Sequence, residues 1–191
     1  MKKGFTLIEI MVSVSIFVIV AMITTGALIT ISDVNRKAQA IKIAMDNVSF
    51  AMDSMVTNLR EGANYHCLTE TTGNLDGYLT GASFGEPSPC FDNGVGLVFG
   101  DRRAGRGGIN KRIIYRFEEN SGLGSIQFAS SDASSNYVSL TSPEVDIDFL
   151  RFYVPNVGNG EVSRVTIVIR GKVSGKTPTE FNLQTTVKSN F

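Results

Sequence analysis

The chain has 191 residues, with 18 lysines and arginines balanced by 18 aspartates and glutamates, one histidine and two cysteines. At about 150 residues per domain, this length predicts one globular domain and an additional N-terminal segment. The balanced charge argues against a generic electrostatic grip on nucleic acid, which depends on many uncompensated lysine and arginine contacts to phosphate.

The N-terminal segment carries Lys2 and Lys3, and residues 5–31 are then apolar apart from Ser and Thr hydroxyls, Gly26 and one carboxylate, Glu9. This run is longer than the about 20 residues that cross a bilayer, and the positive-inside rule keeps the two lysines in the cytoplasm. We therefore expect a single transmembrane helix over 5–31, with the rest of the chain outside the cytoplasm. A secretory signal peptide is the competing interpretation, because Ala38-Gln39-Ala40 matches a cleavage pattern, but the apolar run is about twice the usual length.

The sequence keeps a helical period beyond the apolar run. Its apolar residues recur at steps of three and four, at Val34, Ala38, Ile41, Met45, Val48, Met52, Met55 and Leu59. No proline precedes Pro87, so one helix is predicted from Phe5 to about Arg60, where Glu61-Gly62 ends it. Residues 32–61 are expected to form an extracytoplasmic amphipathic continuation that packs on the protein's own sheet. Pairing of such helices in an oligomer is the alternative.

Residues 62–191 are predicted to form a globular β-rich domain. The stretch 61–94 is rich in Gly, Ser, Thr and Pro and is expected to be irregular. Short alternating or β-branched runs then predict strands at 96–101, 111–119, 125–130, 145–154, 163–173 and 179–189. The hairpin-like spacers 119–124 and 173–178 favour an antiparallel sheet, and a slip in the apolar phase between Phe149 and Leu150 predicts a bulge. The fold class is therefore α+β, a long N-terminal helix packed on an antiparallel β-sheet.

The first residues combine several features in a fixed order. Lys2, Lys3 and Gly4 precede Phe5, and Glu9 follows four residues later inside the apolar run. This arrangement resembles the leader of the type IV prepilins. The resemblance implies a pilin-like fold, removal of the leader peptide 1–4 by a prepilin peptidase that cuts between Gly4 and Phe5, and methylation of the new amino group of Phe5. Glycine suits such a cut because a missing side chain lets the backbone enter a tight protease cleft.

Glu9 is an ionisable side chain inside a membrane segment, where such residues are costly and usually functional. Cleavage would turn the amide nitrogen of Phe5 into an ammonium group with a reference pKa near about 8. The resemblance implies that Glu9 attracts the Phe5 terminus of the adjoining subunit during filament assembly. The alternative is a protonated or otherwise satisfied carboxylate without a role in assembly.

Beyond the first 60 residues the chain is most similar to the minor pseudopilin J group and related minor pilins, over segments 45–62, 164–173 and 181–190. The similarity implies a structural or initiating minor subunit of a type II secretion pseudopilus or type IV pilus, with no catalysis and no cofactor. Such a protein is a single-pass inner-membrane protein whose C-terminal domain lies outside the cytoplasm until it joins the filament. Its implied partners are other pilins or pseudopilins, prepilin peptidase and a minor-subunit tip complex. A membrane-tethered adhesin or a DNA-uptake module of a competence-type pilus is the alternative.

Cys67 and Cys90 are the only cysteines. Outside the cytoplasm we expect a disulfide between them, and the loop that it closes would contribute about 3 kcal/mol in the chain-entropy model. Two free thiols are the alternative.

A basic stretch at 101–112 is the main candidate for a binding surface. Its cations are Arg102, Arg103, Arg106, Lys111 and Arg112. Guanidinium groups bind phosphate or carboxylate through bidentate hydrogen bonds, so this loop is a candidate to bind an anionic partner. The favoured interpretation is a solvated hairpin that meets an acidic neighbour or subunit, because the chain is neutral and no aromatic residue is interleaved for nucleic-acid stacking.

Other motifs point to ordinary structure. His66 is the only histidine and is predicted to be a surface or turn residue. The glycines at 94–100 lack the dinucleotide-binding spacing. Asp and Asn oxygens in the glycine turns 74–77 and 91–94 do not form a complete calcium series, so no metal site is expected.

Overall fold

The computed structural model describes residues 4–69, 78, 87–91, 94–102, 111–131, 136–155, 163–173 and 178–190. Two compact units make up the chain, Met1–Lys42 and Ile43–Phe191, and we call the second the compact unit. One helix, α1 (Leu7–Arg60), supplies residues to both units. The last turns of the helix therefore belong with the β-rich domain.

The part of α1 in the first unit is mostly apolar up to Ile31, and its side chains are exposed as far as Ala40. Within the described chain, α1 is the one helix long and apolar enough to cross a membrane. Five of its hydroxyl groups donate a hydrogen bond to the carbonyl oxygen four residues earlier, at Ser13, Ser15, Thr24, Thr25 and Thr30. These five hydroxyl groups are thus satisfied within the helix, as a lipid environment requires.

The part of α1 in the compact unit buries one face. The buried residues are Ala44, Val48, Ala51, Met52, Met55 and Leu59, and they join a core shared with the strands. Packing of the helix on the protein's own sheet is therefore confirmed from Ala44 onward. Val34, at the start of the predicted apolar stripe, is 61% exposed.

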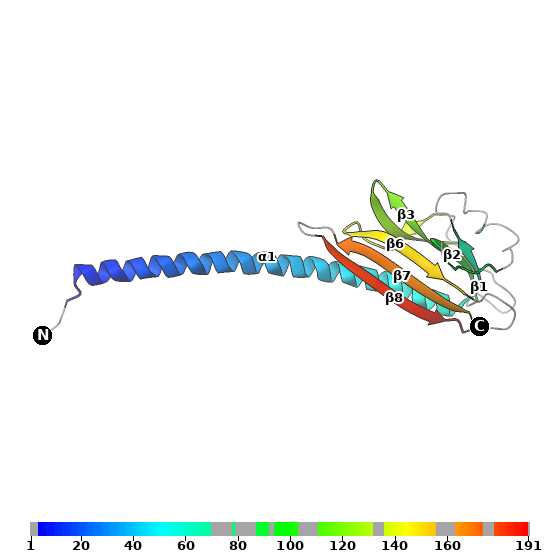
Figure 1. Ribbon diagram of the computed structural model, residues 1–191, viewed down its shortest axis with the longest axis horizontal. Coiled ribbons are helices and arrows are strands. Elements are labelled where there is room, and N and C mark those ends of the chain that lie inside the picture. Colours follow the sequence, from blue (N-terminus) through cyan, green and yellow to red (C-terminus); the bar gives the residue numbers. More distant parts are fainter. Residues whose placement is uncertain are drawn as a thin grey trace. The chain divides into compact units, whose positions relative to one another are not determined.

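The strands form two antiparallel sheets. The first contains β1 (Gly62–Leu68), β2 (Gly96–Asp101), β3 (Lys111–Asn120), β4 (Leu123–Ser130) and β5 (Val138–Ser139) in that order, and the second contains β6 (Val145–Tyr153), β7 (Arg164–Val173) and β8 (Thr179–Lys188). Figure 1 shows β6, β7 and β8 as three adjacent arrows. The predicted strands correspond to β2, β3, β4, β6, β7 and β8. The α+β class with a helix on antiparallel strands is confirmed.

Two strands lie where no strand was predicted. β1 falls inside the stretch 61–94 that was expected to be irregular. Asn64 has a positive φ of 54°, and the register with β2 shifts between Ala63 and His66. This bulge destroys the regular alternation that would mark a strand in the sequence. β5 is only two residues long and carries no pattern.

The turn between β3 and β4 follows the prediction of a hairpin. Ser121 and Gly122 have φ values of 53° and 78°, and Asn120 pairs with Leu123 on either side of them. Two successive positive φ values match the twist of a tight antiparallel hairpin. Of the other predicted spacer, residues 174–177 lie outside the described residues.

The bulge predicted in the 145–154 strand is present one position earlier than expected. The register between β6 and β7 shifts between Ile147 and Phe149, which leaves Asp148 as the extra residue. Leu150 then returns to the core side. The strand therefore changes its alternation close to the predicted position, and the extra residue of the bulge is the polar Asp148.

The helix ends at Arg60, as predicted, and its last carbonyl groups have partners. The Tyr65 hydroxyl donates to the carbonyl oxygen of Leu59 at 2.6 Å, and the Asn190 N–H donates to that of Arg60 at 2.9 Å. Gly62 does not use the left-handed backbone of a usual glycine stop. A Cβ atom at Gly62 would instead lie 2.7 Å from the ring of Phe99, so glycine is needed there for close packing.

Candidate functional site

The bond between Gly4 and Phe5 lies in exposed backbone ahead of the helix. Gly4, Phe5 and Thr6 are not helical, and Phe5 is 79% exposed. A Cβ atom at Gly4 would meet no heavy atom within 4 Å. No described heavy atom therefore obstructs the predicted cleavage position at Gly4. Lys2 and Lys3 of the leader lie outside the described residues.

Thr6 begins the helix. Its carbonyl oxygen accepts hydrogen bonds from the N–H groups of Glu9, at 3.1 Å, and Ile10, at 3.3 Å. Thr6 thus occupies the N-cap position and Glu9 the third helical position, which is the T-x-x-E spacing of a capping box. This spacing was a helix-start signal in the sequence that the prediction of a helix from Phe5 did not use.

Glu9 is an exposed carboxylate in the first turn of α1. The partial positive charge of a helix N-terminus favours a carboxylate there by about 0.3–1 kcal/mol. Glu9 makes no ion pair with any residue in the described part of the chain. The site therefore presents a carboxylate one helical turn after Phe5, surrounded by exposed apolar side chains.

Residues 1–25 match the family model described as the prokaryotic N-terminal methylation motif. The match covers the basic start, the Gly4-Phe5 bond, Glu9 and most of the apolar run. The first 25 residues therefore carry the N-terminal motif of type IV pilin-like proteins. No curated protein and no solved structure matches it.

The motif indicates how proteins that carry it are processed and assembled. Proteins with the motif are processed by prepilin peptidase and assemble with other pilins. They are structural subunits rather than enzymes. The long apolar helix fits anchoring in the inner membrane.

Cys67 and Cys90 form a disulfide, with their Cα atoms 5.3 Å apart. The two cysteines are therefore not free thiols. Cys67 lies in β1, whereas Cys90 exchanges backbone hydrogen bonds with Val154 directly after β6, at 3.1 and 2.9 Å. The bond therefore ties the first sheet to a segment held by the second sheet.

The basic loop is only partly described. Lys111 pairs with Asp101 in the register of β2 and β3, and Arg112 donates a hydrogen bond from Nη1 to the carbonyl oxygen of Tyr78 at 2.9 Å. Arg102 follows β2, and its N–H donates to the carbonyl oxygen of Glu61. Arg103 and Arg106 lie outside the described residues. Arg112 thus has a structural contact, and the structure does not assemble the five cations into one described surface.

His66 is half-buried in β1, and its ring lies 5.1 Å from that of Tyr78. Residues 74–77 and 92–93 of the two candidate calcium turns lie outside the described residues. Within the described part of the chain, no group of three or more His, Cys, Asp or Glu side chains is placed to hold a metal ion.

The buried carboxylate of Asp146 was not predicted as a functional or structural site from the sequence. Asp146 accepts a hydrogen bond from the N–H of Gly124 at 2.8 Å and pairs with Lys172 at 3.0 Å. Burial raises the pKa of Asp146, but the hydrogen bond from the Gly124 N–H and the contact with Lys172 together lower it by more. The pKa of Asp146 therefore lies below its ordinary value. Because Gly124 is in β4 and Lys172 in β7, the carboxylate links the two sheets. No local motif marks this role, since its partners come from distant strands.

Proposed function

We propose that the chain is a structural or initiating minor subunit of a type II secretion pseudopilus or a type IV pilus. One observation carries the proposal, namely an exposed, non-helical Gly4-Phe5 bond directly before an apolar helix whose first turn contains Glu9. The similarity of segments 45–62, 164–173 and 181–190 to the minor pseudopilin J group supports a minor role, with partners in a tip complex.

Processing creates the charge that assembly uses. Prepilin peptidase removes residues 1–4 and methylates the amino group of Phe5, which stays positively charged. In the bilayer, the ammonium group of one subunit and Glu9 of its neighbour are each costly alone and attract strongly when paired. The absence of an ion-pair partner for Glu9 among the described residues of the single chain supports a partner from another subunit.

The compact unit adds a second assembly face. Ile43 and Phe50 are seven residues apart on α1, which places them on one side of the helix, and they are 58% and 67% exposed. The core is formed by a different stripe of the same helix. Large apolar side chains that stay exposed in a single chain are typical of contact surfaces. With the helix in the inner membrane, the compact unit lies outside the cytoplasm.

Processing is tested by the intact mass of the full chain purified from membranes with and without prepilin peptidase. We expect the loss of residues 1–4 and the gain of one methyl group only when the peptidase is present. Gly4→Leu should block cleavage. Gly26→Leu is the matched control, because Gly26 also lies in open space and should be processed normally. Cleavage of Gly4→Leu at the wild-type rate would contradict the assigned position.

Assembly is tested by Glu9→Gln, which keeps the shape of the side chain and removes its charge. We expect the variant to be cleaved and methylated but to be lost from sheared filaments. Asp33→Asn is the control, since Asp33 is another exposed carboxylate on α1. If Glu9→Gln enters filaments as well as Asp33→Asn does, the pairing of Glu9 with Phe5 is wrong.

The position of the compact unit has its own test. In intact spheroplasts, an added protease should digest the compact unit while a cytoplasmic marker protein stays whole. Protection of the compact unit until the membrane is dissolved would place it in the cytoplasm and contradict the proposed topology.

A further inference from the structure

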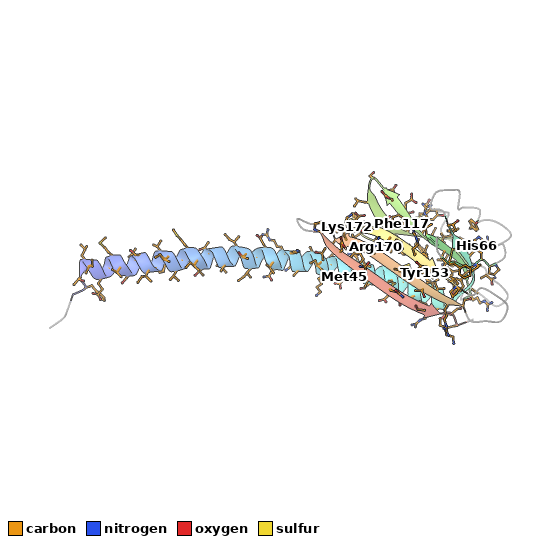
Figure 2. The ribbon with its side chains drawn as sticks, viewed as in Figure 1. Met45, His66, Phe117, Tyr153, Arg170 and Lys172 are labelled. Atoms are coloured by element: carbon orange, nitrogen blue, oxygen red, sulfur yellow. A yellow bond between two sulfur atoms is a disulfide. The ribbon has the colours of Figure 1, made fainter. Side chains whose placement is uncertain are left out.

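The outward face of the second sheet holds two arginines against one aromatic ring. Phe149 and Arg151 of β6 and Val168 and Arg170 of β7 alternate with buried residues and so point away from the core. The register pairs Phe149 with Arg170 and Arg151 with Val168. These four residues form a compact group, which we call the arginine patch. Arg170 is labelled on β7 in Figure 2.

The ring of Phe149 holds both cations. The guanidinium carbon of Arg151 lies 4.6 Å from the ring centroid, and that of Arg170 lies 5.3 Å away. Both distances are within the range of cation–π attraction. The ring therefore restrains two flexible side chains in one place, which reduces the conformational entropy that a ligand would have to remove.

The patch lacks an acidic counterpart in the described part of the chain. No ion pair joins Arg151 or Arg170 to a described carboxylate. The nearby carboxylates Asp146 and Asp148 are both engaged by Lys172, at 3.0 and 3.3 Å. A phenyl ring attracts a cation but does not neutralise it. Two neighbouring positive charges thus remain to be balanced from outside the sheet.

The chemistry of the patch selects carboxylates. A guanidinium group has five N–H donors and can bind a carboxylate through two parallel hydrogen bonds. Arg151 uses one donor, on Nη1, for the carbonyl oxygen of Leu150 at 3.0 Å, and Val168 offers an apolar contact beside the two guanidinium groups. An extended polyphosphate fits less well, because its binding depends on many uncompensated cations. The patch offers only two, and the exposed carboxylates of Asp148 and Glu180 lie on the same face of the sheet. We propose that the arginine patch binds an acidic segment of a partner protein.

This contact is separate from filament assembly. The patch belongs to the compact unit and shares no residue with the Gly4-to-Glu9 segment or with the exposed face of α1 at Ile43 and Phe50. A chain with a defective patch is therefore expected to be processed and assembled normally, and to fail only in the binding of its acidic partner.

The experiment measures the binding of a fluorescein-labelled hexaglutamate peptide to the full chain in detergent micelles, by fluorescence anisotropy at low ionic strength. We expect binding that the double variant R151Q/R170Q weakens about tenfold or more. The control is R164Q/K188Q, which removes the same charge from a register pair on the same face. Because that pair has no aromatic ring between its cations, the control should change affinity by no more than about twofold.

Further variants and a competing ligand decide between the remaining outcomes. R151K/R170K keeps both charges but removes the forks, so its affinity should lie between those of the wild type and R151Q/R170Q. The proposal is overturned if the wild type does not bind hexaglutamate, or if the two neutralised pairs weaken binding equally. Tighter binding of an oligothymidylate than of the peptide would assign the patch to nucleic acid instead. Circular dichroism and the urea midpoint of each variant check that the fold is retained.

Discussion

The two units of this chain use apolar side chains in opposite ways. Up to Lys42, helix α1 exposes large apolar residues such as Phe17 and Ile29, whereas in the compact unit the same helix buries Met55 and Leu59 against two sheets. Apolar area left in water is unfavourable by about 25 cal/mol per Å². The first unit therefore depends on lipid or other subunits, while the second has a core of its own.

Leucine truncation should separate the two units most sharply. Leu59→Ala opens a cavity under a fully buried side chain and is expected to lower the free energy of unfolding of the compact unit by about 2–5 kcal/mol. Leu28→Ala, at an exposed position on the same helix, should change it by less than about 0.5 kcal/mol. Urea unfolding of the full chain in micelles, followed by near-ultraviolet circular dichroism, measures both. Equal effects would mean that the two parts of α1 are not energetically distinct.

Loss of the disulfide is expected to have the next largest effect on the free energy of unfolding, and only in the compact unit. Replacing both Cys67 and Cys90 by Ser is expected to lower its free energy of unfolding by about 3 kcal/mol, because the cysteines are 23 positions apart and the bond restricts the unfolded chain. The far-ultraviolet helical signal of the micelle-bound segment should persist after the compact unit has unfolded. A double variant as stable as the wild type would show that the backbone bridge between Cys90 and Val154 suffices without the bond.

Most strands could be predicted because their side chains alternate between core and solvent. Ile167 and Ile169 in β7 alternate with Val168 and Arg170, and this period is visible in the sequence. β1 could not be predicted, because the bulge at Asn64 interrupts its period. The division into two sheets was also hidden, since alternation tells which face of a strand is buried but not which strand is its neighbour.

The same distinction explains what could be predicted of the sites. Gly4, Phe5 and Glu9 are close in sequence, so their order alone predicts the processing segment. The arginine patch depends on the pairing of Phe149 with Arg170, which only the register of β6 and β7 reveals. Local motifs therefore describe how the chain is processed, whereas surfaces of the compact unit require the fold.

Gly124 of the compact unit and Gly26 of the first unit differ in the space around their Cα atoms. A Cβ atom at Gly124 would overlap the carbonyl oxygen of Ile147 and lie 2.8 Å from the ring of Phe117. Gly124→Ala should therefore lower the free energy of unfolding by about 1–3 kcal/mol. Gly26→Ala meets nothing within 4 Å and should favour the helix by about 0.5–1 kcal/mol. Thermal and urea unfolding of both variants would refute this contrast if Gly124→Ala were tolerated.

A smaller loss of stability at neutral pH is expected at Tyr65, a buried phenol whose hydroxyl contacts the end of α1. Burial raises the pKa of Tyr65 to about 12, although a hydrogen bond with Ser189 lowers it. Tyr65→Phe removes the hydrogen bond to the carbonyl oxygen of Leu59 and should lower the free energy of unfolding by about 1 kcal/mol at pH 7.

The pH dependence of Tyr65→Phe distinguishes the phenol from other groups. A raised folded-state pKa means that the contribution of Tyr65 is complete below pH 10, the ordinary value, and is lost as the pH rises through about 12. Wild-type stability should therefore fall more steeply over this range than that of Tyr65→Phe. Asp146 and Asp148 raise the pKa of Lys172, which adds an alkaline loss of its own, but this loss is common to both proteins. If the free energy of unfolding, measured in urea, fell equally steeply with pH in both proteins, burial would not hold the phenol neutral. The end of the helix would then be more accessible to water than its contacts indicate.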